Sequence, residues 1–192
     1  MIIATLGDSI TAGTPLWDPD PDARARIERP DERSQWQWWA MQTRPQLDFR
    51  NYGVNGERTD QIAVRLDAAL HGAEALVVGG GINDVVQRRP VEDAARNLAS
   101  MVERAQTLGL RVALLDLLPW NNGDGRAAAD IVRLNGLIRE LAERFAIPLY
   151  PFHDTLADPA QPERMRADWT DDGDHPSIEG HRLLGERAFV MP

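Results

Sequence analysis

The sequence predicts an α/β fold in which a parallel β-sheet lies between two layers of helices. Short apolar runs alternate with longer segments in which apolar residues recur every three or four positions. Several of the short runs are nearly continuous in apolar residues, as is typical of strands that are buried on both faces of a parallel sheet. This alternation along 192 residues predicts one three-layer α/β/α domain with right-handed crossovers.

Five segments are expected to form the strands of this sheet. The first, third and fourth are the most apolar, and Gly or Asn residues follow most of the five, which marks turns at their ends. The expected strands are 2–6, 47–52, 75–79, 110–116 and 147–150.

The clearest helices follow the third and fourth strands. Apolar residues between Val91 and Leu108 recur at helical spacing, with Pro90 before them and Gly109 after them. The same spacing joins the apolar residues from Ile131 to Phe145. Shorter helices are expected at 36–44, 59–70 and 178–189, the last of them capped by Ser177.

One segment, 14–33, does not fit this alternation. It contains four prolines mixed with aspartates and arginines, which indicates an extended surface insertion within a single domain of residues 1–192. A lid or a calcium-binding loop would be a functional interpretation of it. A solvated loop or a contact between protomers is the simpler interpretation and the one we favour.

Composition excludes several classes of function. The chain has 30 acidic and 21 basic residues, a net charge of −9, and its basic residues are all arginine. The acidic excess argues against nucleic-acid binding, and without lysine there is no P-loop phosphate site and no Schiff base. Without cysteine there is no disulfide and no thiolate zinc site. No membrane span or secretory signal is visible, so we expect a cytoplasmic protein, with a mature secreted form as the alternative.

Polar residues that could perform catalysis follow the strands, where parallel sheets bind their ligands. Ser9 follows the first strand and is a candidate nucleophile, which requires a neighbouring base. Of four histidines, only His175 lies in a loop marked by Gly and Pro where a strand end is expected, and Asp172 precedes it by three residues. A turn of this length lets the carboxylate bind one imidazole nitrogen while the other faces Ser9. His153 and His181 are expected to be structural or surface residues.

Three groups at strand ends are suited to stabilise an oxyanion. They are the backbone N–H groups of Ser9 and Gly53 and the side-chain amide of Asn83. Each signal is weak alone, because Gly53 could serve only a turn and Asn83 could cap the following segment.

Four motifs in this order resemble those of the SGNH, or GDSL-type, hydrolases. They are Gly7-Asp8-Ser9-Ile10, Asn51-Tyr52-Gly53-Val54-Asn55-Gly56, Gly80-Gly81-Ile82-Asn83-Asp84 and Asp172-Gly173-Asp174-His175-Pro176-Ser177. The resemblance spans nearly the whole chain. It implies a flavodoxin-like sheet of five strands in the order 2-1-3-4-5 and an acyl-serine mechanism that requires no cofactor and no metal. It also implies a small-molecule ester as substrate, without naming it.

We expect short-chain or carbohydrate acyl esters. Trp120 and Trp169 lie in loops at predicted strand ends and could stack on a sugar. The alternative within the family is a lysophospholipase or acyl-thioesterase, which would need a long apolar groove. A different class, a non-catalytic or phosphoacceptor flavodoxin-like module with Asp8 as receiver, is disfavoured by the absence of lysine. A dinucleotide-binding fold is disfavoured because no G-x-G-x-x-G follows the first strand.

Overall fold

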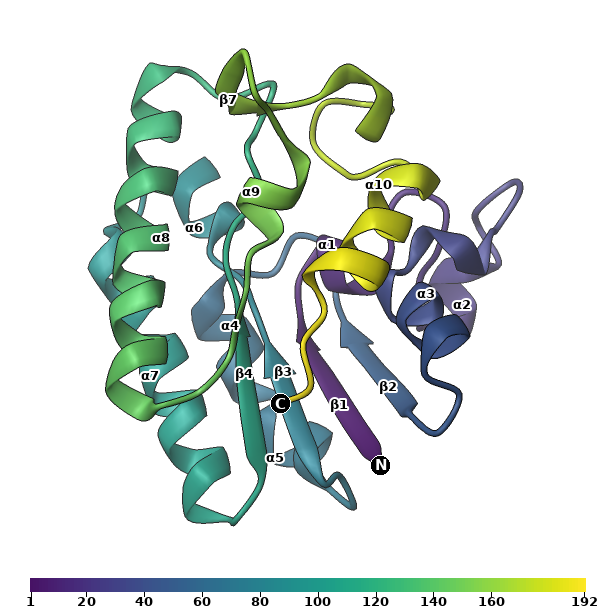
Figure 1. The fold of residues 1–192 in the computed structure, drawn as a ribbon, viewed down its shortest axis with the longest axis vertical. Helices are drawn as coiled ribbons and strands as arrows, with labels where there is room; N and C mark the ends of the chain where they lie inside the picture. The colour runs from purple at the N-terminus through teal and green to yellow at the C-terminus, as the bar shows by residue number, and fades with distance from the viewer.

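The computed structural model describes residues 1–192 and confirms the three-layer α/β/α architecture (Figure 1). Five parallel strands form the central sheet in the order β2-β1-β3-β4-β5. Their registers place Gly7 beside Gly53 and Leu6 beside Val78, so the carboxyl ends of β1, β2 and β3 lie at one edge. The strands are β1 (Ile2–Gly7), β2 (Asp48–Gly53), β3 (Ala75–Val78), β4 (Arg111–Leu115) and β5 (Leu149–Tyr150).

Aliphatic side chains fill one face of the sheet. Ala4, Leu6, Leu76 and Val78 point to this face and belong to a core cluster of 24 buried residues. Burial of this size is the main stabilising contribution to the fold. The helices that cover this face are α4 (Thr59–Val64), α5 (Leu66–Leu70), α7 (Val91–Thr107) and α8 (Gly125–Phe145).

Aromatic side chains dominate the opposite face. Trp36 is fully buried there and packs against Phe49, Tyr150, Phe152 and Phe189 with ring centroids 5.5 to 6.2 Å apart. Trp36 therefore serves the packing of this face. The covering elements are α3 (Trp36–Thr43), α9 (Phe152–Leu156), α10 (Ile178–Leu183) and a π-helical turn at Leu184–Ala188.

Three elements differ from the expectation. Helix α8 begins at Gly125, because Asp124 caps it by accepting the N–H of Ala127. The helix expected at 59–70 is divided at Arg65 into α4 and α5. A two-stranded antiparallel hairpin was not expected and is formed by β6 (Ala157–Asp158) and β7 (Gln161–Met165).

The segment 14–33 follows the short helix α1 (Ser9–Ala12) and lies at the surface beside α3 (Figure 1). It contains the helix α2 (Pro21–Arg24), capped by Asp20, and is followed by a 3₁₀ turn at Glu32–Ser34. Arg24 lies over the Trp17 ring at 4.5 Å and donates to the carbonyl of Asp18. These contacts give the segment a defined local structure.

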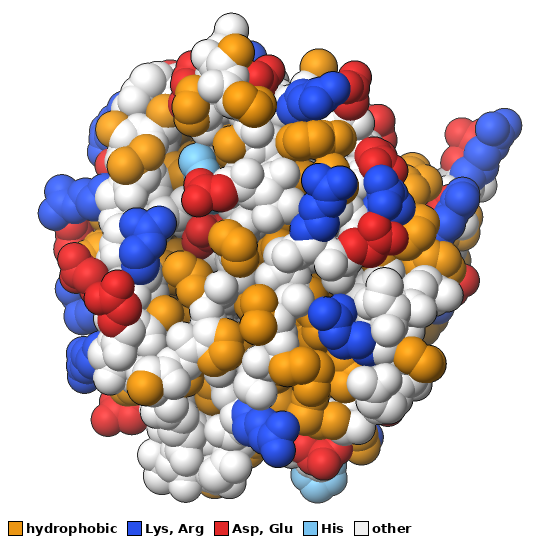
Figure 2. Space-filling view, viewed as in Figure 1, with side chains coloured by type: hydrophobic (Ala, Val, Ile, Leu, Met, Phe, Trp, Pro, Cys, Tyr) orange, Lys and Arg blue, Asp and Glu red, His pale blue; other side chains and the backbone are white.

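Acidic and basic side chains are interspersed on the face that carries α9 and α10 (Figure 2). No single basic region stands out in this view, in agreement with the acidic balance of the chain. None of the helices is both long enough and apolar enough to cross a membrane.

Candidate active site

Ser9 is the first residue of α1, and only Asp8 separates it from the end of β1. Asp8 caps this helix, since its Oδ1 accepts the N–H of Ile10 at 3.1 Å. The helix lies so close to the sheet that two glycines beneath it have no room for a side chain. A Cβ on Gly7 would lie 2.2 Å from Thr11 Oγ1, and one on Gly53 would lie 2.1 Å from the backbone nitrogen of Ala12. These glycines therefore fix where Ser9 is held.

Asn51 joins β2 to this helix. Its Nδ2 donates to the carbonyl of Thr11 at 2.8 Å, and its Oδ1 accepts the N–H of Gly53 at 2.8 Å. The second bond uses the N–H that was expected to stabilise an oxyanion. A bound oxyanion would have to share that N–H with Asn51.

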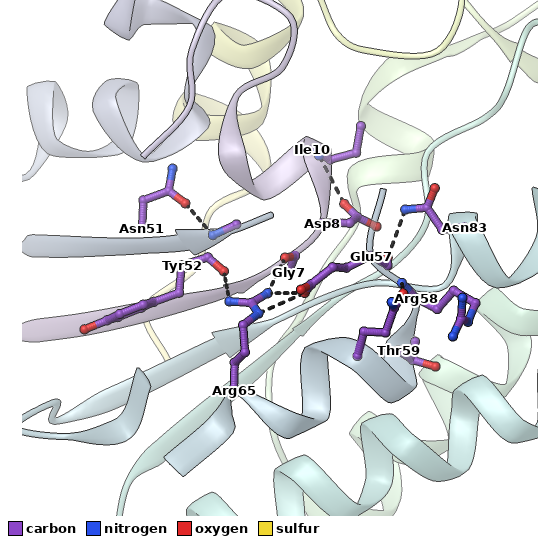
Figure 3. Close-up of polar contacts among 12 residues, drawn as sticks. Gly7, Asp8, Ile10, Asn51, Tyr52, Glu57, Arg58, Thr59, Arg65 and Asn83 are labelled. Atoms are coloured by element: carbon purple, nitrogen blue, oxygen red, sulfur yellow. Dashed lines mark hydrogen bonds and ion pairs between the residues drawn. The ribbon is translucent and has the colours of Figure 1, made fainter. Parts of the chain in front are cut away.

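An ion pair fixes the loop after β2 (Figure 3). Arg65 pairs with Glu57 at 2.5 Å and also donates to the carbonyls of Tyr52 at 2.7 Å and Gly7 at 3.2 Å. The carbonyl of Glu57 in turn accepts one N–H of the Asn83 amide at 2.9 Å. Arg65 thus ties the ends of β1 and β2 to the loop that orients Asn83.

The buried Asp84 holds the start of α4. Its carboxylate accepts both the N–H and the hydroxyl of Thr59, at 2.9 and 3.0 Å. Burial raises the pKa of Asp84, and the bonds from Thr59 oppose that shift. Two contacts therefore fix the position of Asn83. Its own side chain binds the carbonyl of Glu57, and the next residue, Asp84, binds Thr59. We call this assembly of α1, the ends of β1 and β2, and their polar contacts the Ser9 side.

The histidine loop, residues 170–177, forms the other part of the site. Asp172 Oδ2 lies 2.7 Å from His175 Nδ1, and Asp172 Oδ1 accepts the N–H of both Asp174 and His175. Burial alone would raise the pKa of Asp172, but these hydrogen bonds outweigh it and lower that pKa. Asp172 is thus the aspartate that contacts the ring, as the three-residue spacing predicts.

Asp174 has a different role in this loop. Its Oδ1 accepts the indole N–H of Trp120 at 2.6 Å and the amide of Asn122 at 2.7 Å. Asn122 also donates to the carbonyl of Asp172, and the N–H of Asn121 donates to the carbonyl of Gly173. The loop after β4 therefore holds the histidine loop in place. Trp120 takes part in this anchoring through its N–H.

No hydrogen bond joins Ser9 Oγ to His175 Nε2, and neither atom takes part in another hydrogen bond. Burial raises the pKa of Asp8 to about 6, and the nearby charge of His175 opposes this. Catalytic hydrogen bonds often close only when substrate binds.

A cavity lies at the carboxyl ends of β1, β3 and β4. Trp120 lines it, together with residues adjacent in sequence to the candidate catalytic positions: Asp8 and Ile10 beside Ser9, Ile82 before Asn83 and Asp174 before His175. Trp169 lies outside its wall, under the guanidinium of Arg166 at 5.1 Å.

The remaining histidines lie elsewhere. His181 is fully buried in α10, and burial lowers its pKa to about 3, so its ring is neutral and unsuited to the role of base. His153 donates its backbone N–H to Asp116. No group of three or more His, Asp or Glu side chains is arranged to hold a metal ion.

Comparison with known proteins places this geometry in a family. Residues 5–183 match the family model described as GDSL-like Lipase/Acylhydrolase family. A comparison with curated protein sequences gave no significant match.

Solved structures share the fold. A member of the lipolytic protein G-D-S-L family from Veillonella parvula superposes with a TM-score of 0.76 at 21% identity, over 96% of this chain and 94% of that one. An acetyl xylan esterase from Geobacillus stearothermophilus, the Axe2 variant W215I, gives 0.74 at 16% identity, over 97% and 91%. The psychrotrophic esterase EstA from Pseudoalteromonas, inhibited by monoethylphosphonate, gives 0.67 at 20% identity, over 96% and 92%. With the family model matching nearly the whole chain, this protein belongs to the GDSL-like lipase/acylhydrolase family.

Proposed function

We propose that the protein hydrolyses carboxylic esters through an acyl intermediate on Ser9, with short-chain or carbohydrate acyl esters as substrates. The observation that carries this proposal is the 2.7 Å contact between Asp172 and His175 Nδ1. This contact leaves His175 Nε2 available to accept the proton of Ser9 when substrate is bound. The Ser9 hydroxyl has no other hydrogen-bond partner. Membership of a hydrolase family supports the same reaction class.

In the proposed reaction, His175 Nε2 accepts the proton of Ser9 Oγ as that oxygen attacks the ester carbonyl carbon. Asp172 keeps the proton of the ring on Nδ1 and stabilises the imidazolium. The tetrahedral intermediate collapses with cleavage of the ester C–O bond, and His175 gives its proton to the departing alkoxide. Water then attacks the acyl-serine by the same relay and releases the acid.

The developing oxyanion would bind to the N–H of Ser9, the amide of Asn83 and the N–H of Gly53. Asn83 uses one N–H to bind the carbonyl of Glu57, which orients the amide and leaves its second N–H available. Gly53 would contribute while sharing its N–H with Asn51. Asn83 is therefore the donor that we expect to contribute most.

The substrate class rests on the loops around the site. Trp120 lines the cavity and offers an aromatic face, while Trp169 is a weaker candidate because Arg166 covers its ring. One structure that shares the fold is an acetyl xylan esterase. We expect kcat/KM to be highest on acetyl to butyryl esters and to fall steeply beyond about eight carbons, since each further CH₂ needs apolar burial to contribute about 0.8 kcal/mol.

The test is the hydrolysis of nitrophenyl esters of increasing chain length and of acetylated sugars by the wild type and by Ser9→Ala. The variant should fold normally and lose about 10⁴-fold or more in turnover. A serine-directed phosphonate should label Ser9. Near-wild-type turnover by Ser9→Ala would refute the serine mechanism, and a preference for long-chain or lysophospholipid esters would refute the substrate class.

A further inference from the structure

The cavity beside Ser9 has an unusual combination of side chains. Most of its wall is apolar and comes from the end of β4 and the loop after it, and Ile82 and Phe152 also belong to the lining. Its charged residues are all acidic: Asp8, Asp116 and Asp174. No arginine or histidine lines the cavity, so a carboxylate-bearing ligand would find no cationic partner there.

Two of these acids are already committed to the surrounding structure. Asp8 caps α1, and Asp174 accepts the indole of Trp120 and the amide of Asn122. Asp116, directly after β4, accepts the N–H of His153 at 2.8 Å and so caps α9, whose own N-cap residue is Pro151. A carboxyl group offers about four acceptor positions, and this contact uses one of them.

Asp116 is only 6% exposed and pairs with no cation. A buried carboxyl group without a charged partner is unfavourable for folding, and an apolar residue at the wall of an apolar cavity would avoid that penalty. Burial raises the pKa of Asp116 to about 7, partly opposed by the bond from His153. Asp116 thus places a hydrogen-bonding carboxyl group in a mostly apolar wall.

We propose that this cavity is the acyl pocket and that Asp116 makes it selective for short acyl groups that carry a hydroxyl on the second or third carbon. The hydroxyl would donate its proton to the Asp116 carboxyl group, while the carbon chain contacts the apolar wall. Acyl groups that carry a carboxylate are excluded by the three acids. This inference rests on the proposed function, since it assumes that the acyl group is bound to Ser9.

An apolar pocket needs a hydrogen-bond acceptor to distinguish a hydroxylated acyl group from an unhydroxylated one. An apolar pocket distinguishes poorly between an acyl group and its hydroxylated analogue, because the two differ little in shape. A buried acceptor discriminates more strongly, because it remains unpaired when the analogue lacks the donor. Asp116 is therefore a specificity residue, and acetyl esters remain substrates without using it.

The experiment compares phenyl esters of acetate, hydroxyacetate and succinate, with each kcat/KM divided by the rate of alkaline hydrolysis of the same ester. The wild type should favour hydroxyacetate over acetate by about tenfold or more, as one hydrogen bond to a buried carboxyl group allows. It should discriminate against succinate. Asp116→Leu should bring the ratio of hydroxyacetate to acetate, measured within the same variant, to about one.

Glu163→Gln is the matched control. It removes an exposed acid from β7 that does not line the cavity, and it should leave both ratios unchanged. If Asp116→Leu fails to fold, Asp116→Asn replaces it. The Oδ1 of that amide keeps the bond to His153, and its NH₂ removes acceptor capacity, so the preference should still fall.

An unchanged hydroxyacetate preference in the Asp116 variants would overturn the inference, as would an equal loss of turnover on all three esters. Ser9→Ala separates this from the proposed function. If Ser9→Ala abolishes turnover but the kcat/KM ratios between the esters are the same in the wild type and the Asp116 variants, only the inference fails. If Ser9→Ala retains turnover, the proposed function fails.

Discussion

The Ser9 side and the histidine loop are held in contrasting ways. The Ser9 side belongs to the core: α1 rests on Gly7 and Gly53 without space for a Cβ, and the buried Asp8 caps it. The histidine loop lies at the surface, where the Asp172 side chain is 39% exposed. Side-chain hydrogen bonds from Trp120 and Asn122 attach it to the loop after β4.

This difference separates stability from catalysis. Changes on the Ser9 side should affect the free energy of unfolding together with activity, because its contacts are also those of the core. Changes in the histidine loop should lower turnover with little effect on stability, because exposed hydrogen bonds contribute little to folding. The four predictions that follow test this separation, from the largest expected effect to the smallest.

Within the histidine loop, Asp172→Asn should lower kcat/KM by about 10⁴-fold, because an amide cannot hold the required tautomer of His175. The unfolding midpoint should change little. Asp171→Asn is the control and should leave turnover nearly intact, and Asp174→Asn should have an intermediate effect. Equal losses in all three variants would indicate a general electrostatic role for the loop.

On the Ser9 side, Asn83→Ala should lower kcat by about 10²- to 10³-fold with little change in KM, because its amide acts on the oxyanion. Steady-state kinetics on a nitrophenyl ester measures both constants. A change in KM alone would make Asn83 a substrate contact.

The two parts should also respond oppositely to pH. The folded-state pKa of Asp8, about 6, lies above the unfolded value of 3.8, so its stabilising contribution is complete below about pH 4 and is lost as pH rises through 6. The pKa of Asp172 is lowered, so its contribution is present above pH 3.8 and is lost as pH falls. Asp8→Asn keeps a good N-cap and should gain stability relative to the wild type between pH 4 and 6, by roughly 3 kcal/mol at most. Urea unfolding across this range measures it, and a constant difference would contradict the assignment.

Two variants with smaller expected effects compare the contacts that hold the Ser9 side with those that hold the histidine loop. Asn51→Ala removes the link between β2 and α1 and should cost about 1–3 kcal/mol of unfolding free energy. Trp120→Phe removes the indole N–H donated to Asp174, keeps an aromatic though smaller ring, and should lower kcat/KM by roughly tenfold at nearly unchanged stability. Thermal unfolding and kinetics on both variants test the separation, which fails if Trp120→Phe is the more destabilising change.

Much of this arrangement could be predicted from local sequence. Apolar strands between amphipathic segments indicate the layers, and the three-residue spacing from Asp172 to His175 indicates their contact. Contacts between segments that are far apart in the chain leave no such pattern in the local sequence. The link from Trp120 to Asp174 and the clamp formed by Arg65 depend on residues that are brought together only by the fold.

The hairpin of β6 and β7 shows the same limit. Its second strand, Gln161–Met165, is mostly polar and exposed and lacks the alternation typical of a strand. Asn121 holds it from the loop after β4, since its amide binds both the N–H and the carbonyl of Met165. The strand therefore depends on a tertiary contact that its own residues do not indicate.

The strand order of the sheet determines at which stage of folding the candidate active site is assembled. Ser9 and His175 stand near opposite ends of the chain, and the sheet brings them to one edge only after the crossovers through α7 and α8 are complete. Such distant pairings form slowly, because the chain loses the entropy of loop closure before the stabilising contacts are made. The pairing of β1 with β2 and β3 needs only the first 78 residues and can arise early during synthesis. Recovery of the proposed esterase activity should therefore lag behind recovery of helical circular dichroism in a refolding experiment, and turnover would report the last stage of folding.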